Sequence, residues 1–125
     1  MTVLIDSWAW IEYFKGSVPG LKAKEFIDAD SEIIVSSINV SEVYHFLLKN
    51  RSISEAEELI NFLLKTSFVV QLDIQLALQA ARFKYEKKMG LADAIVLATA
   101  RAHHCSIITG DSDFKNEKDL VYLGK

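Results

Sequence analysis

Short apolar runs alternate with longer segments of helical periodicity along the whole chain. Most of the runs are not interrupted by polar residues at every second position, which is typical of strands that are covered on both faces. The alternation predicts an α/β fold, a three-layer α/β/α sandwich with a mostly parallel central sheet of about five strands. The expected strands are 3–5, 32–35, 67–72, 106–108 and 120–123, and the expected helices are 7–14, 21–29, 39–49, 54–65, 73–88 and 91–103.

Local signals mark where some of these elements begin. Ser54 and Glu57 have the spacing of a capping box, and Pro19-Gly20 is the clearest turn in the chain. The last helix is expected to begin just after Gly90. Residues 91–102 are apolar on nearly every side, which predicts that this helix is buried.

Length and composition fit one compact globular domain, which we expect over residues 1–125. Half of the residues are hydrophobic and a quarter are charged. The longest weakly charged stretch falls well short of the roughly 20 apolar residues that span a bilayer, so we expect no membrane insertion. The N-terminal residues lack a signal-peptide pattern and Cys105 has no disulfide partner in the chain, which favours the cytoplasm. The net charge of −3 argues against bulk attraction to nucleic acid but permits a local basic patch.

Four carboxylates follow strands or lie where helices begin: Asp6, Glu42, Asp93 and Asp111. Asp6 and Asp111 come after expected strands, and ligands of open parallel sheets bind beyond the carboxyl ends of the strands. We expect Glu42 in the first turn of the helix after the second strand, and Asp93 in the first turn after Gly90. The pattern therefore predicts that all four side chains gather at one edge of the sheet.

Helix capping explains each of these acids separately, because carboxylates at helix starts complement the positive end of the helix dipole. Capping does not explain the set. Two carboxylates about 4 Å apart repel by roughly 4 kcal/mol at an effective dielectric constant near 20, and an ionised Asp93 in a buried helix needs a partner. A divalent cation removes both costs. Ligands that are all oxygens favour Mg²⁺ or Mn²⁺, which points to phosphodiester chemistry.

Four segments carry a family resemblance: VLIDSWAWIEYFKG, NVSEVYHFL, GLADAIVLATA and IITGDSDF. The chain resembles PIN-domain ribonucleases over essentially its whole length, and among them the VapC-like toxins of toxin–antitoxin pairs. Many of these proteins have a basic residue where this chain has Gly110. Asp113 is either a supporting member of the site or a residue that orders the turn through backbone hydrogen bonds. The resemblance implies catalytic and metal-binding roles for Asp6, Glu42, Asp93 and Asp111, with Ser7 and Thr109 as supporting hydroxyls that orient ligands or water.

The resemblance implies a function and its partners. The chain would be an Mg²⁺- or Mn²⁺-dependent endoribonuclease that cleaves single-stranded or structured RNA, acting as a toxin with a cognate antitoxin and forming a homodimer. The alternative is a catalytically inactive PIN-like module that binds RNA or a protein partner. A phosphatase with an aspartate nucleophile is disfavoured because Trp8 stands where its second acid belongs, and a receiver domain would need paired acids at the first strand.

Two patterns, one metal-binding and one aromatic, allow more than one interpretation. His103-His104-Cys105 suggests zinc, but consecutive side chains at a helix end diverge and the helix dipole already favours histidine there. Aromatic residues near the N-terminus stack on RNA bases in one interpretation and pack on the core or on an antitoxin in the other. These aromatic residues are Trp8, Trp10, Tyr13 and Phe14.

Cationic residues of the second half also need an explanation. Arg101 lies in the helix that we expect to be buried, so its guanidinium needs a carboxylate or an interface, which a homodimer would supply. A basic run on the preceding helix either approaches RNA phosphates or forms an ordinary solvated face. This run consists of Arg82, Lys84, Lys87 and Lys88.

Overall fold

The computed structural model describes residues 2–29 and 31–124, so residues 1, 30 and 125 of the expected domain lie outside it. The described chain contains a five-stranded sheet in the order β3-β2-β1-β4-β5. Every neighbouring pair of strands is parallel, which confirms the predicted α/β fold. The strands are β1 (Thr2–Ile5), β2 (Glu32–Ser36), β3 (Phe68–Val70), β4 (Ser106–Thr109) and β5 (Leu120–Tyr122).

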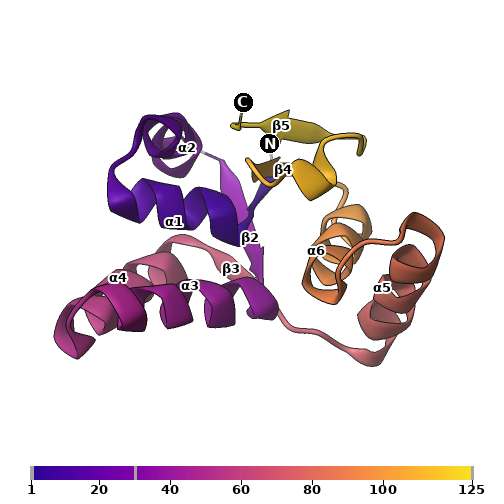
Figure 1. The fold of residues 1–125 in the computed structure, drawn as a ribbon, viewed down its shortest axis with the longest axis horizontal. Coiled ribbons are helices and arrows are strands. Elements are labelled where there is room, and N and C mark those ends of the chain that lie inside the picture. The colour runs from indigo at the N-terminus through magenta and orange to yellow at the C-terminus, as the bar shows by residue number, and fades with distance from the viewer. Residues whose placement is uncertain (1, 30, 125) are drawn as a thin grey trace.

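Helices cover both faces of the sheet (Figure 1). Four helices lie on one face and two on the other, as the three-layer prediction requires. A short 3₁₀ turn, η1 (Ser112–Phe114), stands between β4 and β5. The first face carries α1 (Ser7–Lys15), α2 (Val18–Asp28), α3 (Ser37–Asn50) and α4 (Ile53–Thr66), and the second carries α5 (Ile74–Lys87) and α6 (Leu91–Ala102).

Two hydrophobic cores follow from the alternation of side chains along the strands. In β1, Val3 and Ile5 belong to the core under α1–α4, while Leu4 belongs to the core under α5 and α6. All three side chains are fully buried. The predicted buried helix is confirmed, because every residue of α6 from 94 to 100 is buried. The helix α6 therefore packs directly against the sheet.

The strand order indicates where the sheet would bind a ligand. The chain runs outward from β1 through β2 to β3, and α5 and α6 then return it to β4 on the other side of β1. The strand order thus reverses between β1 and β4, and open α/β sheets bind ligands beyond the carboxyl ends of the strands at such a point. The backbone N–H of Asp6 donates to the carbonyl oxygen of Ile108 at 3.0 Å, which holds these two strand ends together.

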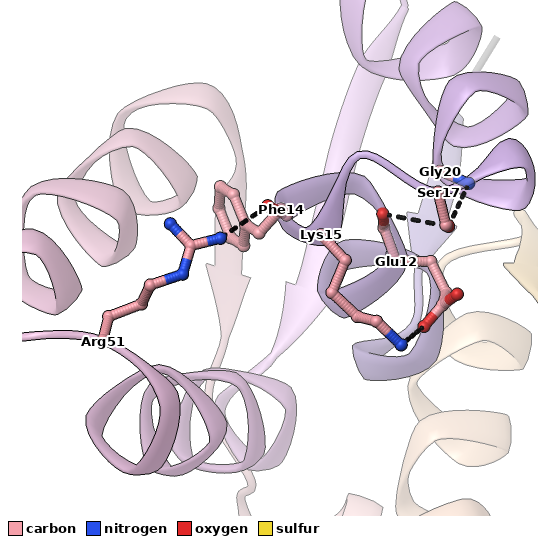
Figure 2. Close-up of polar contacts among 6 residues, drawn as sticks. All are labelled: Glu12, Phe14, Lys15, Ser17, Gly20 and Arg51. Atoms are coloured by element: carbon pink, nitrogen blue, oxygen red, sulfur yellow. Dashed lines mark hydrogen bonds and ion pairs between the residues drawn. The ribbon is translucent and has the colours of Figure 1, made fainter.

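The start of α2 differs from the prediction. Pro19-Gly20 is not a turn before the helix but part of its first turn, where the missing N–H of proline costs nothing. Ser17 caps the helix, since its Oγ accepts from the N–H of Gly20 at 3.1 Å and donates to the carbonyl oxygen of Glu12 (Figure 2). A Cβ on Gly20 would lie 2.1 Å from that same carbonyl oxygen. Glycine therefore allows α1 and α2 to pack closely.

The start of α4 also differs. Ser52, not Ser54, caps this helix: its Oγ accepts from the N–H of Glu55 at 3.1 Å and donates to the Glu55 carboxylate at 3.0 Å. The spacing of a capping box occurs twice in succession here, as Ser52 to Glu55 and as Ser54 to Glu57. The sequence alone does not choose between them.

Among the described helices, none is long and apolar enough to cross a membrane.

Candidate metal centre

Asp6 lies at the carboxyl end of β1 and is 5% exposed. It occupies the N-cap position of α1, but its side chain makes no capping hydrogen bond with that helix. The carboxylate instead accepts from Thr109 Oγ1 at 2.8 Å and from Asn39 Nδ2 at 3.2 Å. Capping therefore does not account for Asp6. Its partners come from two other elements, β4 and α3.

Burial raises the pKa of Asp6 to about 6. The Thr109 hydroxyl and the Ser7 backbone lower this pKa, while the negative charges of Glu42 and Asp111 raise it further. The two acids that act on Asp6 are the ones that the sequence placed near it. The hydrogen bonds thus stabilise an ionised Asp6 in a setting that disfavours its charge.

A chain of hydrogen bonds connects Asp6 to Glu42. Asn39 Nδ2 donates to Ser7 Oγ at 2.8 Å, and Ser7 Oγ donates to Glu42 Oε1 at 2.7 Å. Asn39 Oδ1 accepts from the backbone N–H of Ser36 at 3.0 Å, so Asn39 forms a capping box with Ser36. Glu42 is exposed and lies in the second turn of α3, because this helix begins at Ser37 and not at Asn39 as predicted.

The sequence analysis missed the role of Asn39. This side chain is fully buried and contacts Asp6 and Ser7 at once. An asparagine inside an apolar segment that directly follows a buried strand was the available signal, since a buried amide needs hydrogen-bond partners.

Three further carboxylates face one another across the site. Oxygen atoms of Asp93, Asp111 and Asp113 all lie within 4.8 Å of one another. Asp93 is in the first turn of α6, which begins after Gly90 as predicted. The other two belong to the segment after β4. Asp113 thus joins the cluster, although the sequence left its role open.

The turn that carries Asp111 and Asp113 is ordered by Asp111. Its backbone N–H donates to Thr109 Oγ1 at 3.0 Å, and its carboxylate accepts from the N–H of Asp113 at 2.9 Å. The carboxylate of Asp113 faces Asp93 and Asp111 instead, with oxygen atoms of the three residues within 4.8 Å of one another. The turn-ordering role considered for Asp113 therefore belongs to its neighbour.

The pKa of Asp93 is raised further than that of Asp6. Burial first, and then the hydrogen bond with Asp113 and the charges of Asp111, Asp6 and Asp113, raise its pKa to about 8. The donor set consists of carboxylate oxygens, which are the ligands that Mg²⁺ and Mn²⁺ prefer. A divalent cation would neutralise the mutual repulsion that these shifts express. The residues therefore fit such an ion.

Of the N-terminal aromatic residues, Trp10 belongs to the core under α1–α4, and the half-buried Trp8, Tyr13 and Phe14 pack against that core. Trp10 is fully buried, with ring centroids 5.9 Å from Tyr13 and 5.7 Å from Phe14. Trp8 lies against the backbone of Gly110, where an added Cβ would be 2.3 Å from the indole. The indole thus fills the space that a side chain at position 110 would need. The core interpretation fits these residues.

The other two patterns have local explanations. His103 and His104 are exposed, whereas Cys105 is buried and its thiol lies 3.7 Å from the carbonyl oxygen of Ala100. In residues 2–29 and 31–124, the cluster able to hold a metal is the acidic one. Arg101 pairs with Glu117 of the same chain at 3.1 Å, so a homodimer is not needed to explain its charge.

Known proteins share this fold and part of this sequence. Ribonuclease VapC11 of Mycobacterium tuberculosis is 26% identical over 118 residues, covering 90% of this chain and 88% of the relative. A toxin–antitoxin complex from Klebsiella pneumoniae contains a chain that is 27% identical, with a TM-score of 0.81 and 98% of both chains covered. M. tuberculosis VapC20, described as a sarcin–ricin loop cleaving toxin, has a TM-score of 0.77 at 18% identity, with 94% and 95% covered.

A family profile matches nearly all of the chain. Residues 3–119 match the profile of the PIN domain. The matched segment runs from β1 to the end of the turn after β4, so it contains all the carboxylates described above. The segments that carried the resemblance, from VLIDSW to IITGDSDF, lie within it. The chain therefore belongs to the PIN-domain family.

Proposed function

We propose that this chain is an Mg²⁺- or Mn²⁺-dependent endoribonuclease that cleaves single-stranded or structured RNA, and that it is the toxin of a toxin–antitoxin pair. One observation carries the proposal: carboxylates from β1, α3, α6 and the segment after β4 converge where the strand order reverses. The ribonucleases and toxin–antitoxin complexes among the similar proteins support the choice of substrate and partner.

We assign the metal to the carboxylates of Asp6, Asp93 and Asp111, with Asp113 as a fourth oxygen donor. Bound there, Mg²⁺ or Mn²⁺ supplies positive charge for the scissile phosphate and lowers the pKa of a water molecule for in-line attack. Thr109 donates to Asp6 and so holds its lone pairs in a fixed direction. No covalent intermediate with the protein is required.

Glu42 is assigned a different task. Ser7 donates to its carboxylate at 2.7 Å, which fixes one oxygen and leaves the other free to accept a proton or orient a water molecule. Glu42 is exposed, so solvent and substrate reach it. Asn39 positions Ser7 and Asp6 together, which couples the proton acceptor to the metal ligand.

The antitoxin is assigned to a groove of about 620 Å³ between α1, α2 and α4. Its walls combine aromatic and aliphatic side chains with one cation and one acid, which suits an amphipathic peptide. Phe14 and Gly20, both drawn in Figure 2, belong to this groove. The lining residues are Tyr13, Phe14, Gly16, Gly20, Leu21, Lys24, Glu58, Leu59 and Phe62.

A homodimer and a cytoplasmic location complete the proposal. The outer face of α5 exposes Ile74, Leu78 and Tyr85, which are 76%, 64% and 87% exposed and follow one another at helical spacing. Apolar side chains this exposed favour a covered face, and a second copy of the chain is the partner that we assign to it. The free thiol of Cys105 suits the reducing cytoplasm.

The direct test is cleavage of end-labelled RNA by the wild type and by Asp93→Asn, with Mg²⁺ or Mn²⁺ and with a chelator. We expect cleavage by the wild type only when the cation is present, and none by the variant. Asp28→Asn is the matched control, because this exposed acid on α2 lies away from the site. Cleavage that survives both the chelator and Asp93→Asn would overturn the proposal.

The alternative function is a PIN-like module that binds RNA or a protein without cleaving. It predicts RNA or partner binding with no turnover at any cation concentration. The same assay distinguishes the two functions, because the wild type then leaves the labelled RNA intact while retarding it in a native gel.

A further inference from the structure

The segment that joins β4 to β5 carries two of the clustered acids and is held at two points. We call residues 110–119 the acidic loop. Near its start, Asp111 and Asp113 face Asp93 of α6. The first attachment is Phe114, which follows these acids and is fully buried in the core under α5 and α6. The second attachment is Glu117, whose backbone N–H donates to the carbonyl oxygen of Phe114 at 2.9 Å.

Glu117 forms ion pairs with two basic side chains through one carboxylate oxygen. Its Oε1 lies 3.1 Å from Arg101 Nη2 of α6 and 3.1 Å from Lys87 Nζ of α5. The Glu117 side chain is only 12% exposed, so solvent screens this pairing less than that of a surface ion pair. Phe83 lies beside both basic side chains, with its ring centroid 5.9 Å from Lys87 Nζ and 5.8 Å from Arg101 Cζ. We call Glu117, Arg101 and Lys87 the Glu117 clamp.

The clamp joins the same two elements whose acids repel each other. Arg101 is on the helix that carries Asp93, and Glu117 is four residues after Asp113 on the acidic loop. When they are ionised, the carboxylates of Asp93, Asp111 and Asp113 repel one another across less than 4.8 Å, which pushes the loop away from α6. The ion pairs of Glu117 pull the loop towards α5 and α6. The clamp thus opposes the repulsion that the cluster generates when it holds no cation.

We propose that Glu117 is a positioning residue that sets the distance between Asp93 and the acids of the loop, and thereby the affinity of the site for a divalent cation. This inference rests on the proposed function. It assigns no contact with substrate or cation to the clamp itself. Supporting residues of metal sites typically change metal affinity by about 10- to 100-fold when they are removed.

Two substitutions of opposite charge separate positioning from simple electrostatics. Glu117→Gln removes a negative charge near the site, and Arg101→Gln removes a positive one. If only the long-range field mattered, the first would weaken cation binding and the second would strengthen it. Positioning predicts that both weaken binding, because each breaks the same clamp. The double variant should be no weaker than the poorer single variant, since the two changes share one interaction.

The experiment is calorimetric titration of the purified full chain with Mn²⁺, together with RNA cleavage at varied Mn²⁺. We expect Glu117→Gln and Arg101→Gln to raise the dissociation constant about tenfold and to raise the Mn²⁺ concentration for half-maximal cleavage equally. The cleavage rate at saturating Mn²⁺ should change less than about threefold, because no catalytic group is altered. Glu12→Gln is the matched control, a 17%-exposed acid paired with Lys15 at 3.0 Å on α1.

The outcomes are distinguishable. A wild type that binds no Mn²⁺ and cleaves no RNA overturns the proposed function, and this inference with it. A wild type that binds and cleaves, with unchanged Mn²⁺ affinity in both variants, overturns this inference alone, as does tighter binding by Arg101→Gln. If either variant fails to fold, Lys87→Gln takes its place, because Lys87 is 35% exposed and contributes one of the two ion pairs. It should weaken Mn²⁺ binding in the same direction by about threefold.

Discussion

The two halves of the acidic site hold their carboxylates in different ways. In the half formed by β1 and α3, neutral groups separate the acids: Thr109 and Asn39 donate to Asp6, and Ser7 donates to Glu42. In the half formed by α6 and the acidic loop, the three clustered acids face one another within 4.8 Å. The pKa values follow this difference, since Asp6 is raised to about 6 although it is the more deeply buried, and Asp93 to about 8.

The contrast shows that burial alone does not decide the state of a carboxylate. Asp6 is buried with hydrogen-bond donors that favour its charge, whereas Asp93 is half-buried among acids that oppose its charge. The first half is therefore organised before any ligand arrives. In the second half, the clustered carboxylates disfavour one another's ionisation, and a positive charge bound between them would remove that effect.

Asp93→Asn should produce the largest effect, because it removes an acid from the half that needs the cation. We expect RNA cleavage to fall by on the order of 10³-fold, as the loss of a metal ligand removes several kcal/mol of transition-state stabilisation. The initial rate of cleavage of a fluorescent RNA at saturating Mn²⁺ is the measurement, with circular dichroism to check the fold. A rate within threefold of the wild type would remove Asp93 from the site.

Thr109→Val should have the next largest effect, because it removes the donor that fixes Asp6 without changing any acid. Cleavage should fall by about 10- to 100-fold. Thr99→Val is a close control: Thr99 is 1% exposed on α6 and its hydroxyl donates to the carbonyl oxygen of Ile95 of its own helix. Equal losses of cleavage in the two variants would show that Thr109 acts through stability alone.

Glu42→Gln should reduce turnover without changing cation affinity, since Ser7 holds Glu42 in the half that neutral groups organise. We expect kcat to fall about tenfold while the Mn²⁺ dissociation constant stays within about twofold. Steady-state kinetics and calorimetric titration measure the two quantities, and Glu57→Gln on the exposed face of α4 is the control. A tenfold loss of Mn²⁺ affinity would instead make Glu42 a metal ligand.

The stability of the metal-free protein should depend on pH with a defined sign. The folded protein raises the pKa of Asp6 from 3.8 to about 6, so it binds this proton more tightly than the unfolded chain does. The resulting stabilisation is present below about pH 4 and is lost as the pH rises through 6. The free energy of unfolding of Asp6→Asn should therefore rise relative to that of the wild type with increasing pH, and the total gain at pH 8 should be about 3 kcal/mol.

Urea unfolding of both proteins in chelator at pH 4, 6 and 8 measures this difference. A difference in the free energy of unfolding that stays constant across these pH values would contradict the raised pKa. A difference of the opposite sign would mean that the hydrogen bonds of Asp6 outweigh its burial.

The sequence predicted the elements whose signal is strong and local. The five strands and the buried α6 followed from uninterrupted apolar runs, and Asp6, Asp93 and Asp111 lie at the strand end, helix start and turn where they were expected. Their convergence required only the rule that parallel strands present their carboxyl ends at one edge.

Other features depend on contacts between distant parts of the chain. The bonds of Asn39 to Asp6 and Ser7 span more than thirty residues, and no local pattern indicates them. The partner of Arg101 lies sixteen residues away, beyond β4 and η1, so an interface was an equally good expectation. The helix starts at Ser17 and Ser52 were misplaced because several residues nearby can cap, and only tertiary packing selects one.

Thermal unfolding of the wild type and Asp93→Asn at pH 8, in chelator and then in Mn²⁺, tests the central claim most directly. The claim is that Asp93 of α6 and the acids of the acidic loop destabilise one another when ionised, and that a bound divalent cation removes this destabilisation. We expect Asp93→Asn to melt about 3–6 °C higher than the wild type in chelator, and Mn²⁺ to raise the melting temperature of the wild type only. A lower melting temperature for Asp93→Asn in chelator, with no response of the wild type to Mn²⁺, would contradict it.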